Sequence, residues 1–109
     1  MIKMDTVVQF EQVAEKGEPF LLLKHSVTRP ISLTAYDEYV KFFKEHPDYK
    51  SFYLTVQDAR PLSNYIAEKY HIKHESPQAI LFVNKDVAWH ASHRQITNTT
   101  LRKVIEENQ

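Results

Sequence analysis

The hydrophobic and polar positions of this chain follow two rhythms, one with the spacing of helices and the other with that of strands. Apolar residues at helical spacing predict four helices, which begin near Thr6, Pro30, Pro61 and Thr97. Continuous apolar runs between them predict four strands, Phe20 to His25, Tyr49 to Val56, Ala79 to Val83 and Val87 to Ala91. The predicted order is therefore helix, strand, helix, strand, helix, strand, strand, helix.

Capping residues, glycine and proline support the predicted helix boundaries. Thr6 and Gln9 have the spacing of a capping box, which satisfies free N–H groups at a helix start. Gly17 is the only glycine, and it stands where a helix C-terminus needs a positive φ. Pro30 can occupy a first helical turn, where its missing N–H costs nothing, and Pro47 ends the pattern that follows it.

The order of elements predicts the fold. Strand, helix and strand make a right-handed parallel βαβ unit, and a third helix then leads into an antiparallel hairpin. This is the order of the thioredoxin-like fold. We therefore expect one α/β domain over residues 1–109, with a central four-stranded mixed sheet flanked by helices. The unbroken apolar stretch Phe20 to His25 indicates burial on both faces, so we expect it at the centre of the sheet.

In this fold the end of the first core strand and the start of the next helix form an active-site edge. A proline before the hairpin lies beside that edge, and Pro77 is in that position. A cis Ser76–Pro77 bond would offer the backbone of Ser76 for pairing with an extended chain, whereas a trans bond would mark an ordinary strand start. In this fold we favour the cis form.

Composition excludes several function classes. The chain has 109 residues, of which 42% are hydrophobic, enough for one packed core. Fourteen basic residues balance fourteen acidic ones, so no long-range field favours nucleic acid or an anionic membrane. No apolar run has the length of a signal peptide or a membrane span. We expect a cytoplasmic protein without nucleic-acid or membrane partners.

The candidate active-site turn lacks a nucleophile. A helix N-terminus stabilises a thiolate and lowers the pKa of a cysteine placed there. The chain contains no cysteine, and Arg29 stands at this position. A guanidinium is always protonated and cannot attack a disulfide. The sequence therefore combines a redox scaffold with the absence of the reactive atom.

Five separated motifs carry a resemblance to a known family. They are Phe20–Ser26, Pro30–Ser32, Arg60–Ala67, His74–Ala79 and Trp89–His93. In these motifs the chain resembles the YtxJ family of bacilliredoxins. The resemblance implies a thioredoxin-like thiol–disulfide oxidoreductase that removes bacillithiol from mixed disulfides with a single cysteine. It implies bacillithiol or bacillithiolated proteins as partners, and we expect no cofactor.

The resemblance also assigns the site residues. The expected motif Thr-Cys-Pro-Ile-Ser corresponds to Thr28–Ser32, so Arg29 occupies the nucleophile position and Ser32 the position of a resolving cysteine in dithiol relatives. Thiol–disulfide turnover is therefore not expected of this sequence. The residues expected to line the binding edge are His25, Ser26, Thr28, Pro30, Ser76, Pro77 and Trp89.

An alternative function is a non-catalytic binding or regulatory module. Arg29 would add a fixed positive charge to a helix N-terminus that already favours anions. A carboxylate, phosphate or sulfate could bind there, and bacillithiol carries carboxylates in its malate moiety. The competing interpretation is a solvated arginine without a ligand. The sequence does not distinguish a natural Arg29 from an introduced one.

The histidines and Trp89 have ordinary interpretations beside functional ones. His71 and His74 are three residues apart, as are His90 and His93, but we favour structural or surface roles and expect no metal site. His25 could hydrogen-bond a ligand or be satisfied within the strand end, and Trp89 could belong to the core or line a groove. No serine has the flanking glycines of a hydrolase nucleophile.

Overall fold

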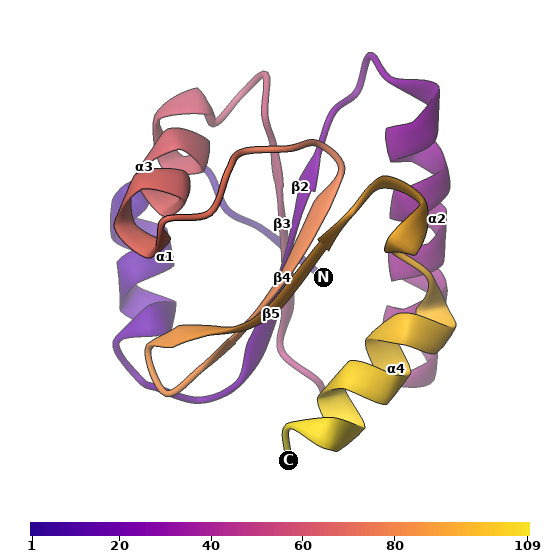
Figure 1. The fold of residues 1–109 in the computed structure, drawn as a ribbon. Helices are drawn as coiled ribbons and strands as arrows, with labels where there is room; N and C mark the ends of the chain where they lie inside the picture. The colour runs from indigo at the N-terminus through magenta and orange to yellow at the C-terminus, as the bar shows by residue number, and fades with distance from the viewer.

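Five strands form one mixed sheet in the computed structural model, which describes residues 1–109, and helices cover both faces (Figure 1). The strands are β1 (Ile2–Lys3), β2 (Phe20–His25), β3 (Ser51–Thr55), β4 (Gln78–Val83) and β5 (Asp86–Ser92). The helices are α1 (Val7–Ala14), α2 (Pro30–Glu45), α3 (Arg60–Tyr70) and α4 (Asn98–Glu107), with a 3₁₀ turn, η1 (His93–Gln95), before α4. The predicted mixed sheet between helices is confirmed.

Strand β2 lies at the centre of the sheet, as predicted. The strand order is β1-β3-β2-β4-β5, and β2 pairs parallel with β3 and antiparallel with β4. All six of its residues are buried. Two neighbouring strands satisfy its backbone groups while helices cover both faces, which explains why this strand has an almost continuous apolar sequence.

The prediction of four strands was wrong by one, because β1 adds a fifth strand at the edge beside β3. Only two residues form it, and Ile2 pairs with Phe52. A two-residue strand has no period to detect, and both of its side chains are exposed. Its position depends instead on long-range contacts. Met4, just after it, is buried, and its N–H donates to the Tyr53 carbonyl at 2.8 Å.

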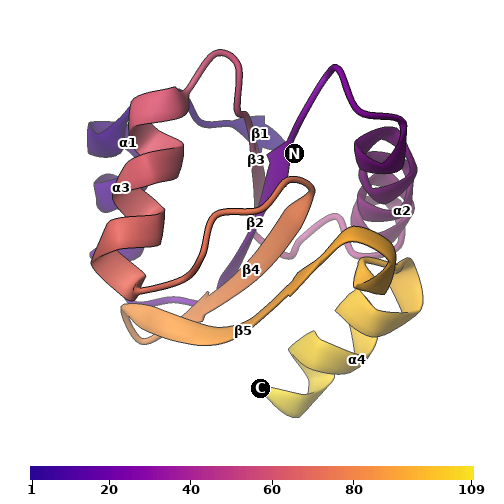
Figure 2. The same cartoon turned by 45° about the horizontal axis from the view of Figure 1, so that its top comes forward.

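Two apolar layers form the core, one on each face of the sheet (Figure 2). Helices α1 and α3 lie together over one face, and α2 and α4 over the other. Successive residues of β2 point alternately into the two layers, so Leu22 belongs to the first while Leu21 and Leu23 belong to the second. Strand β2 therefore joins the two layers.

The predicted caps are present. The Gln9 N–H donates to Thr6 Oγ1, and the Thr6 N–H donates to Gln9 Oε1, each at 3.1 Å. Gly17 has a φ of 74° and accepts an N–H from Asn84 at 3.0 Å through its carbonyl. The Thr100 N–H donates to Thr97 Oγ1 at 3.1 Å. These three positions confirm the helix boundaries predicted from the sequence.

Tyr39 ties α2 to the sheet and provides a test of this packing. Its side chain is fully buried, and its hydroxyl donates to the Phe52 carbonyl at 2.8 Å. We expect Tyr39→Phe to lower the free energy of unfolding by about 1 kcal/mol, because the substitution removes a buried hydrogen bond. Urea unfolding measures this loss.

Tyr36→Phe is the matched control, because Tyr36 is on the same helix and its hydroxyl makes no hydrogen bond. Its effect should stay within about 0.5 kcal/mol. Equal losses in the two variants would contradict the assigned role of the Tyr39 hydroxyl.

Candidate functional site

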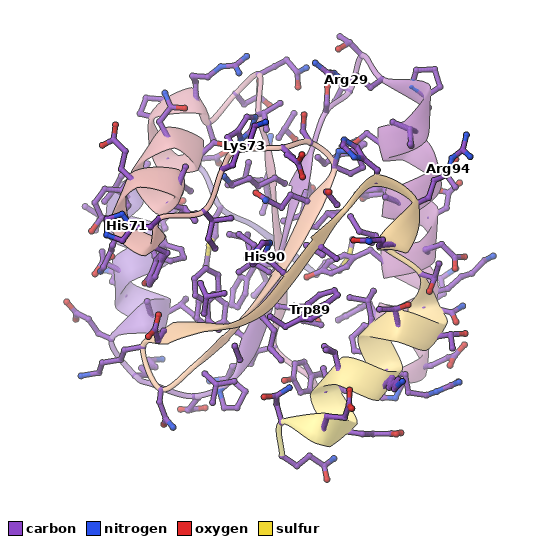
Figure 3. The ribbon with its side chains drawn as sticks, viewed as in Figure 1. Arg29, His71, Lys73, Trp89, His90 and Arg94 are labelled. Carbon is purple, nitrogen blue, oxygen red and sulfur yellow. The ribbon has the colours of Figure 1, made fainter.

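The predicted active-site edge lies where β2 ends and α2 begins. The Ser76–Pro77 bond just before β4 is cis, as favoured from the sequence. Beside these segments is a pocket of about 280 Å³ whose lining is entirely polar, here called the Arg29 pocket. Its lining residues are Arg29, Lys73, His74, Glu75, Ser76 and His93. Figure 3 shows Arg29 and Lys73 at this end of the molecule. Two of the predicted site residues, Arg29 and Ser76, thus meet at one pocket.

Arg29 is the N-cap residue of α2, with extended backbone angles of φ −113° and ψ 123°. Its side chain is exposed and makes no capping hydrogen bond. It also forms none of the ion pairs in the structure, all of which involve lysines. Its positive charge therefore stands without a carboxylate partner at the start of a helix, where anions are favoured.

Gln57 holds the loop before Arg29 in place. Its side-chain N–H groups donate to Ser26 Oγ at 2.9 Å and Thr28 Oγ1 at 3.3 Å, and its carbonyl accepts the Val27 N–H at 3.3 Å. Gln57 was not among the site residues predicted from the sequence. Its signal was positional, because a polar side chain just after β3 lies at the same sheet edge as the end of the parallel strand β2.

Ser32 points into the protein instead of toward a ligand. Its side chain is buried, and its Oγ accepts the Ser26 N–H at 2.8 Å. The same oxygen lies 2.9 Å from His25 Nδ1. His25 is also buried and lies against the Tyr36 ring, with 4.8 Å between ring centroids. Burial lowers the pKa of His25, so its imidazole is neutral near pH 7. Ser32 and His25 thus stabilise the turn from β2 into α2.

Lys24 is a second residue that was not predicted from the sequence. Its side chain is fully buried, and its Nζ donates to the Ser63 carbonyl at 3.0 Å. The same Nζ lies 3.4 Å from His74 Nδ1 in the wall of the Arg29 pocket. No carboxylate pairs with it, and burial lowers its pKa to about 8. The signal was a lysine inside an apolar strand, since a lysine is seldom fully buried without a partner.

His74 connects this buried lysine with the pocket. Its Nδ1 also lies 3.1 Å from Ser63 Oγ. Burial lowers the pKa of His74, and the nearby positive charges of Lys24, Arg60 and Arg29 lower it further. The imidazole is therefore neutral near pH 7, and it meets cationic groups on more than one side.

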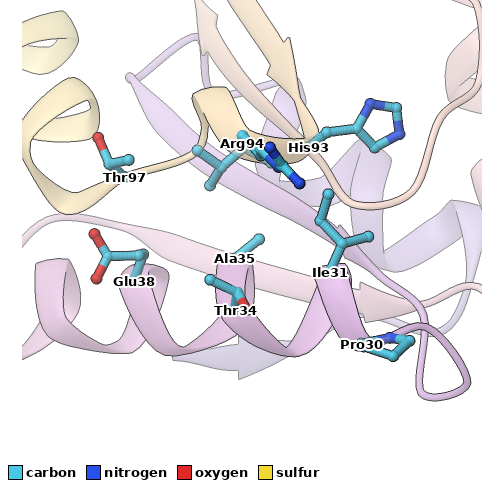
Figure 4. Close-up of a pocket in the computed structure, with 9 residues that line it drawn as sticks. Pro30, Ile31, Thr34, Ala35, Glu38, His93, Arg94 and Thr97 are labelled. Carbon is cyan, nitrogen blue, oxygen red and sulfur yellow. The ribbon is translucent and has the colours of Figure 1, made fainter.

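A second pocket, of about 440 Å³, lies between α2 and the segment that leads into α4 (Figure 4). His93 lines both pockets. Pro30 lines this second pocket, together with the apolar side chains of Ile31 and Ile96. Trp89 lines neither of them: it is half-buried and packs against the apolar layer beneath α2 and α4. Of the predicted binding residues, Trp89 therefore lies apart.

The histidine pairs do not gather into a ligand set. His71 is at the C-terminal end of α3 and exposed, while His74 faces Lys24. No group of three or more histidine, aspartate or glutamate side chains is placed to hold a metal ion. None of the helices has both the length and the apolar character needed to cross a membrane.

Comparisons with known proteins agree with this geometry. The family described as monothiol bacilliredoxin BrxC matches residues 2–101. The chain belongs to this family.

Solved structures share the fold of this chain. A protein assigned as an oxidoreductase with a thioredoxin fold is 46% identical, with a TM-score of 0.89 over 95% of this chain and 92% of that one. Thioredoxin from Trypanosoma brucei brucei is 15% identical, with a TM-score of 0.80 over 99% and 89% of the two chains. Fasciola hepatica thioredoxin is 15% identical, with a TM-score of 0.78 over both full lengths. These two thioredoxins show the fold alone, and the predicted thioredoxin-like fold is confirmed.

The missing cysteine is significant because the BrxC family is described by its single thiol. The family is monothiol by description, and this member has no thiol in any of its 109 residues. Its association with the bacillithiol system therefore follows from the family alone, and thiol catalysis by this chain is doubtful.

The buried Lys24 predicts an unusual dependence of stability on pH. Its pKa is about 8 in the folded protein and 10.5 in the absence of burial. The unfolded chain therefore binds more protons between these values, and the free energy of unfolding rises with pH across that window. Between about pH 7.5 and pH 9.5 the contribution should be about 2 kcal/mol.

Lys24→Met removes this contribution. We expect urea unfolding to show that the unmodified protein gains about 2 kcal/mol relative to Lys24→Met across the same window. Parallel pH profiles for the two proteins would show that Lys24 titrates normally and would contradict the assigned burial.

Proposed function

We propose that this BrxC-family chain is a bacilliredoxin without thiol–disulfide turnover, which binds bacillithiol or bacillithiolated protein segments at the edge around Arg29. The observation that carries the proposal is the Arg29 side chain, which is cationic and has no ion-pair partner. It stands at the position that the motif resemblance assigns to the family's nucleophile. The elements around it remain in place, including the loop held by Gln57 and the cis Ser76–Pro77 bond.

The absence of turnover follows from the chemistry of exchange. Releasing bacillithiol requires a thiolate to attack one sulfur of the mixed disulfide while the other sulfur leaves as a thiolate. This chain offers no thiolate. The Ser32 hydroxyl is no substitute, because it is buried and held by the Ser26 N–H.

Binding at this edge has physical support. Arg29 and Lys73 supply positive charge for the carboxylates of the bacillithiol malate moiety. Ser76 precedes the cis proline and lines the same pocket, where its backbone can pair with an extended segment. The chain's zero net charge gives no long-range attraction to nucleic acid. The setting we propose is the bacterial cytoplasm.

A second candidate function is recognition of an unmodified protein segment by a regulatory module. The observation that favours it is the second pocket, where Ile31 and Ile96 offer apolar surface next to the Arg29 pocket. The two pockets meet at His93, so an extended segment crossing the edge would touch both.

Binding of one cysteine-containing peptide in two forms tests the proposal. One form carries bacillithiol as a mixed disulfide, and the other has its thiol methylated. We expect calorimetry to show tighter binding of the bacillithiolated form. Arg29→Ala should weaken that binding by about 5- to 50-fold, because it removes a charge-assisted contact to a carboxylate.

Arg102→Ala is the control, since Arg102 is an exposed arginine of α4 that lines neither pocket. It should leave the affinity unchanged. Equal binding of the two peptide forms would favour the regulatory module, and no binding of either form would overturn both functions.

A further inference from the structure

The Arg29 pocket has a feature that its cationic rim does not explain, namely a lysine buried beneath its wall. Lys24 Nζ is 3.0 Å from the Ser63 carbonyl and 3.4 Å from His74 Nδ1, and no carboxylate lies within ion-pair distance. Burying a charge without a counter-charge is costly. We therefore expect Lys24 to have a role besides stabilising the fold.

The contacts of Lys24 determine which nitrogen of His74 carries the proton. An ammonium group has donors and no acceptor, so His74 Nδ1 must accept when it lies beside Lys24 Nζ. Ser63 Oγ, 3.1 Å from the same nitrogen, can donate to it as well. The neutral imidazole then carries its hydrogen on Nε2, the nitrogen left for the pocket that His74 lines.

We propose that Lys24 and Ser63 hold His74 in the Nε2–H form, so that His74 and Arg29 together bind one oxyanion, a carboxylate or a phosphate, in the Arg29 pocket. This inference rests on the proposed function, because the ligand occupies the same pocket. Lys24 and Ser63 act here as positioning residues, since they are buried and reach the ligand only through His74.

Size and charge agree with this ligand class. The pocket measures about 280 Å³, which suits one small group better than a whole cofactor. Arg29 and Lys73 line it, and Lys24 lies beneath it. Glu75 is the single carboxylate in the lining, and a hydrogen bond from Ser92, then the charges of His93 and Lys73, lower its pKa. One ionised carboxylate does not neutralise these cations, so the pocket favours an anion.

The arrangement predicts a dependence on pH. Lys24 and Arg60 face His74 from β2 and α3, Arg29 faces it from the start of α2, and Glu75 is its neighbour in the chain. Of the three cations, Lys24 is the one that loses its proton as the pH rises above about 8, its pKa. A neutral amine can accept as well as donate, so the restraint on the His74 tautomer is lost above that pH.

NMR of the ¹⁵N-labelled full chain tests the inference directly. Long-range ¹H–¹⁵N spectra distinguish the two imidazole tautomers, and we expect the Nε2–H form for His74 at about pH 7. Acetate and inorganic phosphate, titrated separately, should shift the signals of the His74 Nε2–H and the Arg29 side chain. A response to acetate identifies a carboxylate site, a response to phosphate a phosphate site, and either response supports the proposal.

Lys24→Met should mix the tautomers and weaken binding of the responding anion by about 3- to 10-fold. Lys73→Met is the matched control, since it removes a lysine charge from the same pocket and the Lys73 side chain makes no hydrogen bond to His74. It should weaken binding and leave the tautomer unchanged. Raising the pH of the unmodified protein to about 9.5 should mix the tautomers too, which keeps the test informative if Lys24→Met fails to fold.

Four results would overturn the inference: an Nδ1–H tautomer in the unmodified protein, a tautomer that stays fixed when Lys24 is replaced or deprotonated, anions that shift Arg29 without shifting His74, or no shift of either residue with acetate or phosphate. The proposed function fails separately, when a bacillithiolated peptide does not bind. Either result can be obtained without the other.

Discussion

The burial of β2 between two strands and two apolar layers is the constraint on which the rest of this structure depends. Every side chain of Phe20–His25 is buried, and its neighbours β3 and β4 satisfy its backbone groups. The strand alternates between the two layers, so α1 and α3 on one face and α2 and α4 on the other are placed relative to it. Its last residues, Lys24 and His25, are buried as well and lie at the edge where α2 begins. The candidate site is therefore an extension of the core.

At that edge the helix start and the buried lysine both favour negative charge. A helix N-terminus that would stabilise a thiolate holds a permanent cation in this member of the BrxC family, and the buried Lys24 adds a second positive charge below the pocket wall. Arg29 places a positive charge at the start of α2, where a thiolate would be negative. The field that would have lowered a thiol pKa is then available to hold an anionic ligand.

The sequence predicted the elements whose signal is local or periodic. Residues close together in the chain determine the cap at Thr6, the positive φ of Gly17 and the burial of β2. The order of the elements then predicted the fold. The edge strand β1 was missed because its two residues are placed by pairing with β3. Arg29 and Ser76 were identified through motifs, but Lys24, Gln57 and Lys73 were not, because their roles arise from contacts distant in the chain. Trp89, expected at the binding edge, packs beneath the helices instead.

Release of bacillithiol from a bacillithiolated model protein, compared between the unmodified chain and Arg29→Cys, shows whether residue 29 alone separates this protein from a thiol catalyst. If the scaffold is intact, the unmodified chain shows no release and Arg29→Cys shows release. The thiol of Arg29→Cys should have a pKa below that of a free cysteine. Release by the unmodified chain, or a folded Arg29→Cys protein that stays inactive, would contradict this prediction.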